Sequence, residues 1–189
     1  MLHDENAFGV LFAFYDLEDC EYALEPEAFA ERFTEFRNSV LGSASEVSLG
    51  SGTRAFDFGH ALYFEVGDGD QTTDPIAWLR RVKDAVSARD FAVCAVLSHG
   101  GRWLAEDESG WPESDSLAGG YHFVQLSRPS EPLRRALAAE AATHGTDGSD
   151  GWGAGTYVDT EAVEALGKSL KNAPTPLAAA GATFYRIGR

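Results

Sequence analysis

The stretch 56–98 decides the fold, because it holds two apolar runs on either side of an amphipathic segment. FDFGHALYFEV (56–66) alternates apolar and polar residues with a period of two, and FAVCAVLS (91–98) is continuously apolar, so each run predicts a β-strand. Between them, Asp74 can cap a helix whose first residue is Pro75. The apolar residues of that helix recur at helical spacing: Ile76, Leu79, Val82 and Val86. The stretch therefore predicts strand, helix, strand.

The preceding residues predict another strand and another helix. AFGVLFAFY (7–15) is almost unbroken apolar sequence, which is typical of a strand covered on both faces. A helix is expected from Pro26 to Gly42. One face of it carries Phe29, Phe33, Phe36 and Val40. EVSL (46–49) predicts a short strand, and the glycine-rich turn at 50–52 is expected to form a hairpin with the strand at 56–66.

The order of these elements indicates a fold class. Through residue 98 it reads strand, helix, strand, strand, helix, strand, which is the split βαβ, or ferredoxin-like, arrangement. Such a unit is an antiparallel sheet with both helices on one face. The alternative is a mixed sheet of another topology with helices on both faces.

The rest of the chain predicts an extension of this core. Gly100-Gly101 favours a tight hairpin, after which 102–105 would return as a strand. A strand at 121–126, a helix at 130–141, a mobile glycine-rich loop at 145–155, a helix capped by Asp159 or Thr160, and a final strand at 182–187 follow. We therefore predict a single α+β domain over 1–189. Residues 1–106 form the βαββαβ core plus the hairpin strand, and 107–189 form a C-terminal extension.

Charge and cysteine content narrow the function classes. The net charge is −15, from 15 Lys and Arg against 30 Asp and Glu, so the surface repels nucleic acid and anionic membranes and attracts basic partners, or serves solubility alone. The first residues lack the positive charge and apolar run of a secretory signal, and no apolar run is long enough to span a membrane. Cys94 lies in an apolar strand and is expected to be a buried free thiol. These features favour a cytoplasmic protein.

Three histidines raise the possibility of an enzyme. His60, His99 and His122 lie on or beside predicted strands, and three imidazoles can hold zinc with one position open for water. No HExxH, HxH or cysteine pair at ligand spacing accompanies them, and each can be a packed or turn histidine. Asp57 and His60 could pair as base and orienter, but the alternation of 56–66 places them on opposite faces. We therefore assign no catalytic residue, metal ligand or cofactor.

Two acidic loops are candidate cation sites. Asp68, Asp70 and Asp74 share one loop, and Asp147 and Asp150 share another, which is the oxygen-rich chemistry that calcium prefers. Neither loop matches the EF-hand pattern, and the closing Glu is absent. Solvated turns are the favoured interpretation.

Aromatic residues within acidic loops suggest a binding surface, because aromatic side chains anchor interfaces and charged rims steer partners. The candidate partner-binding residues are Trp111 with Glu108, Glu113 and Asp115, and Trp152 with Asp150. Trp111 and Trp152 could equally cover the edge of the core. The leading hypothesis is a non-catalytic acidic protein-binding domain, such as an immunity-type inhibitor of a basic toxin or enzyme. The alternative is a hydrolase or metal-dependent enzyme that uses His60, His99 and His122. The oligomeric state is left open.

Overall fold

A computed structural model of the chain describes residues 2–14, 24–57, 61–105, 155–168, 177–179 and 182–187. The elements within these ranges are β1 (Leu2–Phe14), α2 (Pro26–Glu46), β2 (Arg54–Asp57), β3 (Ala61–Gly67), α3 (Pro75–Ser87), β4 (Val93–Ala105), β5 (Gly155–Asp159), α6 (Thr160–Ala165), β6 (Leu177–Ala179) and β7 (Ala182–Arg186). No helix among the described residues is long and apolar enough to cross a membrane.

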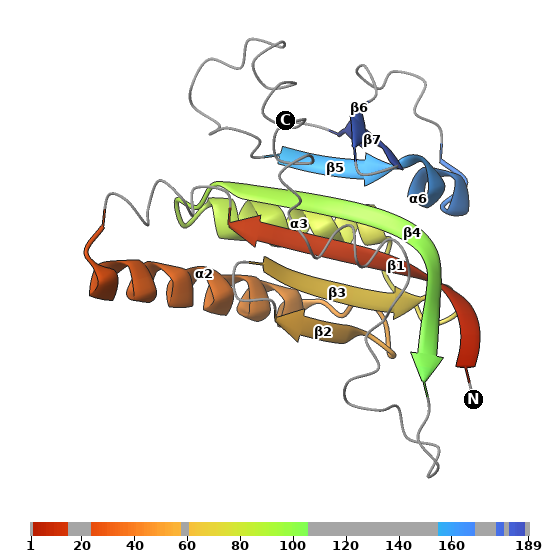
Figure 1. Ribbon diagram of the computed structural model, residues 1–189, viewed down its shortest axis with the longest axis horizontal. Coiled ribbons are helices and arrows are strands. Elements are labelled where there is room, and N and C mark those ends of the chain that lie inside the picture. Colours follow the sequence, from red (N-terminus) through yellow and green to blue (C-terminus); the bar gives the residue numbers. More distant parts are fainter. Residues whose placement is uncertain are drawn as a thin grey trace.

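The seven described strands form one mixed sheet in the order β2-β3-β1-β4-β5-β7-β6 (Figure 1). All neighbouring strands are antiparallel except β4 and β5, which are parallel. β1 and β4 lie at the centre and pair along 13 residues, from Leu2 opposite Ala105 to Phe14 opposite Val93. The long central pair thus joins the N-terminal strands to the strands that follow residue 154.

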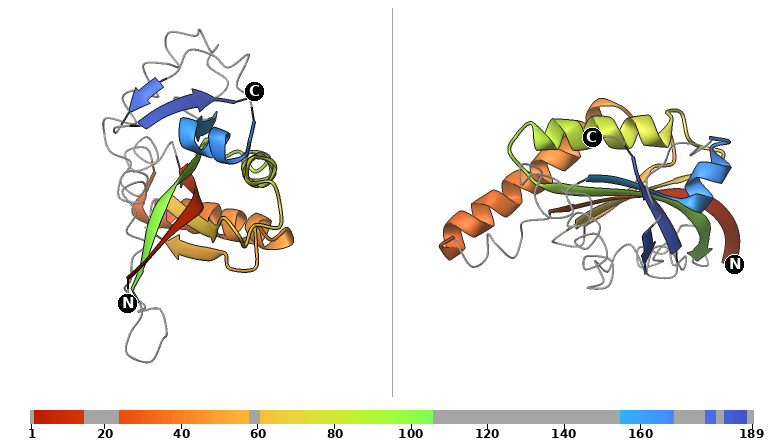
Figure 2. Two further views of the ribbon diagram at one scale, coloured as in Figure 1. Left: turned by 90° about the vertical axis from the view of Figure 1, so that its right-hand side faces the viewer. Right: turned by 90° about the horizontal axis from the view of Figure 1, so that it is seen from above.

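Helices α2 and α3 lie side by side on one face of the sheet (Figure 2). The apolar side chains of that face and of the two helices form one buried core. From α2 come Phe36 and Val40, and from α3 come Leu79, Val82 and Val86. The sheet contributes Phe8, Val10, Phe12, Leu62, Phe64, Val66, Val93, Ala95 and Leu97. Alternation along each strand leaves the residues between these on the second face of the sheet.

The structure confirms the α+β class and several local predictions. α3 begins at Pro75, and the Asp74 side chain caps it by accepting a hydrogen bond from the Ile76 N–H at 2.9 Å. Asp159 likewise caps α6, through the Ala162 N–H at 2.7 Å. Both helices begin where a carboxylate satisfies a backbone donor that has no partner inside the helix.

The predicted end of the first helix at Gly42 is wrong. α2 continues to Glu46, so 46–49 is not a strand, and Gly42 lies inside the helix with no atom near its missing side chain. Ala44 and Val47 still pack against the core beyond it. That packing holds the last helical turn in spite of the low helix propensity of glycine.

One strand prediction and one hairpin prediction are also wrong. The run 56–66 is not one strand but the end of β2 and most of β3, with 58–60 outside the described residues. Consequently Phe56 lies opposite Tyr63 on the second face, and Asp57 lies opposite Leu62 on the helix face. Gly100-Gly101 does not turn the chain, because β1 extends far enough to pair with β4 as far as Ala105.

The C-terminal predictions are tested only in part. The strand predicted at 182–187 is present as β7, and β5 follows directly on the glycine-rich segment. The predicted strand at 121–126, the helix at 130–141 and most of the loop at 145–155 lie outside the described residues. The division at residue 106 stays a prediction, while the sheet itself runs through both parts.

Candidate functional site

Buried polar side chains gather on the second face of the sheet, away from α2 and α3. Glu65 of β3 lies opposite Gly9 of β1, and Gly9 lies opposite Ser98 of β4. Asp159 of β5 lies beside Ser98, one position beyond the last parallel pair. Glu65 and Ser98 are each 1% exposed and Asp159 is fully buried. Charged side chains are almost never fully buried without a specific reason, so this cross-strand row is the strongest candidate site among the described residues.

Asp159 is the best-defined member of the row. Its carboxylate accepts hydrogen bonds from the Ser98 hydroxyl, from the His99 N–H at 3.3 Å and from the Ala162 N–H. Burial raises the pKa of Asp159, while the Ser98 hydrogen bond and the backbone donors act in the opposite direction. The side chain accepts a hydrogen bond from a β4 amide where β5 stops pairing with β4 and the chain enters α6, so it holds β4 and the start of α6 together.

Two tyrosines lie against the sheet beside this row. A side chain on Gly9 would come within 2.8 Å of the Tyr63 ring, and one on Gly155 would come within 3.3 Å of Tyr157. Tyr63 and Tyr157 are 4% and 1% exposed. Glycine is thus required at position 9 so that the tyrosine can lie close to the backbone.

The two carboxylates of the row are too far apart to bind one ion together. Glu65 and Asp159 are separated by three strand-to-strand steps of ~4.8 Å, about 14 Å in total. Oxygen ligands of a shared cation lie within ~2.6 Å of it. The row therefore has two separate carboxyl side chains, with the Ser98 hydroxyl and Gly9 between them. No group of three metal-binding side chains occurs among the described residues.

The histidine hypothesis finds no support in the described geometry. The His99 ring packs against Phe8 with ring centroids 4.7 Å apart. Its Nε2 lies 3.0 and 3.1 Å from the two carboxylate oxygens of Asp68. His60 and His122 lie outside the described residues. His99 is therefore held by an acidic partner on the helix face and does not face the buried row.

Other candidate residues have structural roles or are not described. Asp74 bonds Lys168 with one carboxylate oxygen and caps α3 with the other. Cys94 is buried, and burial raises the pKa of its thiol to about 12, which fits the expected inert thiol. The predicted partner-binding residues all lie outside the described residues: Glu108, Trp111, Glu113, Asp115, Asp150 and Trp152. A role for them with a basic partner stays a prediction.

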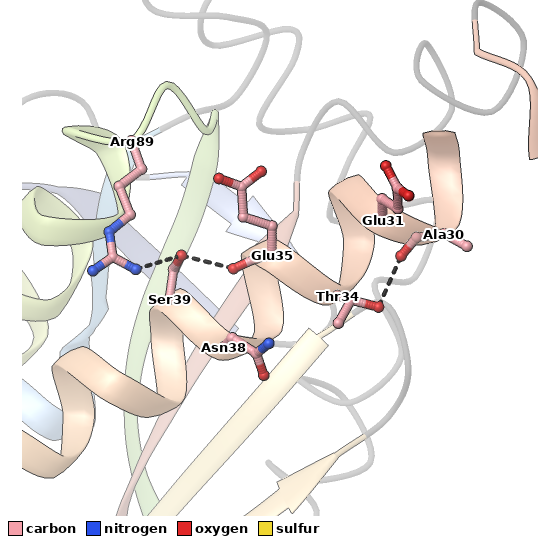
Figure 3. A pocket seen from close by; sticks show the side chains of 7 residues that line it. All are labelled: Ala30, Glu31, Thr34, Glu35, Asn38, Ser39 and Arg89. Atoms are coloured by element: carbon pink, nitrogen blue, oxygen red, sulfur yellow. Dashed lines mark hydrogen bonds between the residues drawn. The ribbon is translucent and has the colours of Figure 1, made fainter. Parts of the chain in front are cut away.

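A shallow groove of about 490 Å³ lies on the opposite side of the molecule, along α2 (Figure 3). Arg89, from the turn after α3, donates to the Ser39 hydroxyl at 2.8 Å, and Ser39 in turn donates to the Glu35 carbonyl at 2.7 Å. Glu31 and Glu35 of α2 also line the groove. Its polar groups mostly serve to hold the α3–β4 turn against α2.

Comparisons with known proteins identify the fold. No protein-family model matches the sequence, and no curated protein matches it. The structure, however, is similar to adenylyl and guanylyl cyclases. The adenylyl cyclase CyaB from P. aeruginosa matches with a TM-score of 0.56 and 11% identity, over 100% of this chain and 96% of that chain. The catalytic core of a rhodopsin-guanylyl cyclase in complex with ATPalphaS matches with a TM-score of 0.57 and 9% identity, over 100% and 99%.

A third match differs in its stated role. A class III adenylyl cyclase-like ATP-binding protein from Pseudomonas aeruginosa matches with a TM-score of 0.55 and 16% identity, over 89% of this chain and 36% of that chain. At these identities the likeness defines the fold alone: the chain shares its fold with adenylyl and guanylyl cyclase domains.

This fold overturns both functional hypotheses drawn from the sequence. A non-catalytic, immunity-type inhibitor and a hydrolase or metal-dependent enzyme using His60, His99 and His122 are both wrong, since the structure matches adenylyl and guanylyl cyclases over 97% to 100% of this chain. The charge of −15 and the missing motifs led to wrong functional predictions, because neither property indicates the order of the strands in the sheet. Sequence reasoning also missed the buried row. The only available signal was a Glu and a Gly inside otherwise apolar strands.

Proposed function

We propose that this chain is a purine-nucleotide-binding domain built on the class III cyclase fold. The observation that carries the proposal is the correspondence over full length: the chain covers 96% of one adenylyl cyclase chain and 99% of one guanylyl cyclase catalytic core. Two of the matched structures are described with ATP or an ATP analogue. Within this fold, we assign the first four strands to a ferredoxin-like unit, supported by their antiparallel order β2-β3-β1-β4.

We propose that the nucleotide binds on the second face of the sheet. Supporting this, the helix face is filled by the apolar core, whereas Glu65, Ser98 and Asp159 lie on or at the edge of the other face. Because the chain carries a net charge of −15, a free nucleoside triphosphate would be repelled. The nucleotide is therefore expected to bind as its complex with a divalent cation, which neutralises part of the phosphate charge.

Thermal unfolding of the full chain tests this proposal. ATP or GTP with Mg²⁺ should raise the melting temperature in a concentration-dependent way, because a ligand of the folded state stabilises it. Inorganic triphosphate with Mg²⁺ should raise it less, since it lacks the base. No shift with either nucleotide at about 1 mM would contradict the proposal, because it limits any affinity to the millimolar range.

A matched pair of variants tests the location. Glu65→Gln removes one negative charge from the proposed face, and Glu35→Gln makes the same chemical change on α2. The first should change nucleotide affinity by about threefold or more, and the second should leave it unchanged, because charge effects across the molecule are screened by solvent. Equal effects of the two variants would contradict binding on the second face.

Cyclisation of the nucleotide is a second candidate function, favoured by the matches to enzymes titled adenylyl and guanylyl cyclases. Chromatography of the reaction mixture after incubation with ATP or GTP and Mg²⁺ or Mn²⁺ tests it. A cyclic nucleotide formed together with pyrophosphate would establish cyclase activity. Saturable binding without either product would limit the function to nucleotide binding.

A further inference from the structure

The short helix α6 depends on contacts with other elements for its position. It has six residues, Thr160–Ala165, which is too short to be stable alone. Asp159 caps its first turn. Beyond its last residue the chain changes direction at Gly167, whose φ of 60° is the left-handed conformation that glycine favours. This turn directs Lys168 back toward the start of α3, where it bonds Asp74. Both ends of α6 are therefore tied to elements outside it.

The loop between β3 and α3, residues 68–74, is tied to the same region from the other side. Asp68, at its start, contacts the His99 ring of β4 through both carboxylate oxygens, and Asp74, at its end, bonds Lys168. The His99 N–H in turn donates to Asp159. The contacts form a closed ring that runs from the loop to β4, to Asp159, through α6 to Lys168, and back to the loop.

We propose that this ring makes the 68–74 loop and α6 a single cooperative unit, so that the hydrogen bonds of both segments open and close together. The loop also bonds the segment 48–51, and α6 is anchored through the buried Ala162 and Val163, so the ring links two segments that each have a further attachment. Cooperative units of this kind open together with a free energy below that of global unfolding. The Lys168–Asp74 pair is partly exposed, with 41% of each side chain accessible, so salt weakens it. The unit is thus a salt-sensitive connection between the first four strands and the β5–α6 segment.

Amide hydrogen exchange of the full chain tests the coupling, because each segment contains its own reporters. In the loop, Thr72 and Thr73 donate their N–H groups to the Leu49 carbonyl. Just after α6, Leu166 and Lys168 donate their N–H groups to the carbonyls of Ala162 and Val163 within the helix. His99→Leu removes the side-chain donor to Asp68 and so cuts the ring at β4; it should speed exchange at Leu166 and Lys168 by about threefold or more.

Lys168→Ala cuts the ring at its other side and should speed exchange at Thr72 and Thr73 by a similar factor. Raising the salt concentration from about 50 mM to about 1 M should speed both reporter sets in the wild type. Lys83→Ala removes a pair with Asp84 on α3, in which Lys83 is half-buried and Asp84 exposed, and is the matched control, expected to change neither set. Changes confined to amides beside each substitution, or double-variant effects that simply add, would show that the two segments are independent and would overturn the proposal.

Discussion

At the scale of single residues, Asp159 combines burial with three hydrogen-bond donors. Burial raises its pKa above the ordinary 3.8, so the folded protein holds the proton to a higher pH than the unfolded chain does. Where the folded state binds more protons, the free energy of unfolding falls as pH rises. This component of stability is fully present below the ordinary pKa and is lost as pH rises through the native pKa.

The variant Asp159→Asn isolates this effect, because asparagine keeps an acceptor oxygen but does not titrate. Urea unfolding at several pH values from about 4 to about 7 gives the free energy of unfolding of both proteins. The value for wild type minus the value for the variant should decrease as pH rises. A difference that increases with pH would mean that hydrogen bonding to the carboxylate outweighs its burial.

Gly9 supports a second residue-scale prediction. Gly9→Ala places a methyl group against the Tyr63 ring, so we expect the free energy of unfolding to fall by about 1–3 kcal/mol. In a Tyr63→Val background the same substitution should cost clearly less, because the overlapping ring is gone. An equal cost in both backgrounds, measured by urea unfolding, would show that the contact with Tyr63 is not the cause.

At the scale of elements, α2 provides the opposite test for glycine. Gly42 is exposed inside the helix and nothing lies within 4 Å of its missing side chain. Gly42→Ala should therefore stabilise the protein by about 0.5–1 kcal/mol, since alanine is the better helix former. A loss of stability on thermal or urea unfolding would indicate that the helix end is under a constraint not visible in its contacts.

Elements were predictable where one local pattern decided them. The Asp74-Pro75 start and the apolar stripe of α3 gave that helix correctly, and AFGVLFAFY gave most of β1. Gly42 and Gly100-Gly101 led to wrong predictions. Packing on the core continues α2 past Gly42, and pairing with β1 continues β4 past Gly100-Gly101, so tertiary contacts override a local stop signal at both positions. The buried row could not be predicted, since Gly9 and Asp159 become neighbours of Ser98 only through pairing between distant strands.

At the scale of the whole molecule, the net charge of −15 acts on the folded state as a whole. Like charges held close together repel, and salt screens that repulsion. The melting temperature should therefore rise as NaCl increases from about 20 mM to about 300 mM. A fall over this range would mean that favourable ion pairs, such as Lys168–Asp74, outweigh the repulsion.

The same charge affects the proposed binding of a purine nucleotide, because an acidic chain repels a free triphosphate. Isothermal titration of ATP and GTP into the full chain, with Mg²⁺ and then with a chelator, measures this binding. We expect saturable binding of at least one of the two nucleotides with Mg²⁺, and binding at least about tenfold weaker without it. No saturable heat with either nucleotide up to about 1 mM in the presence of Mg²⁺ would contradict it.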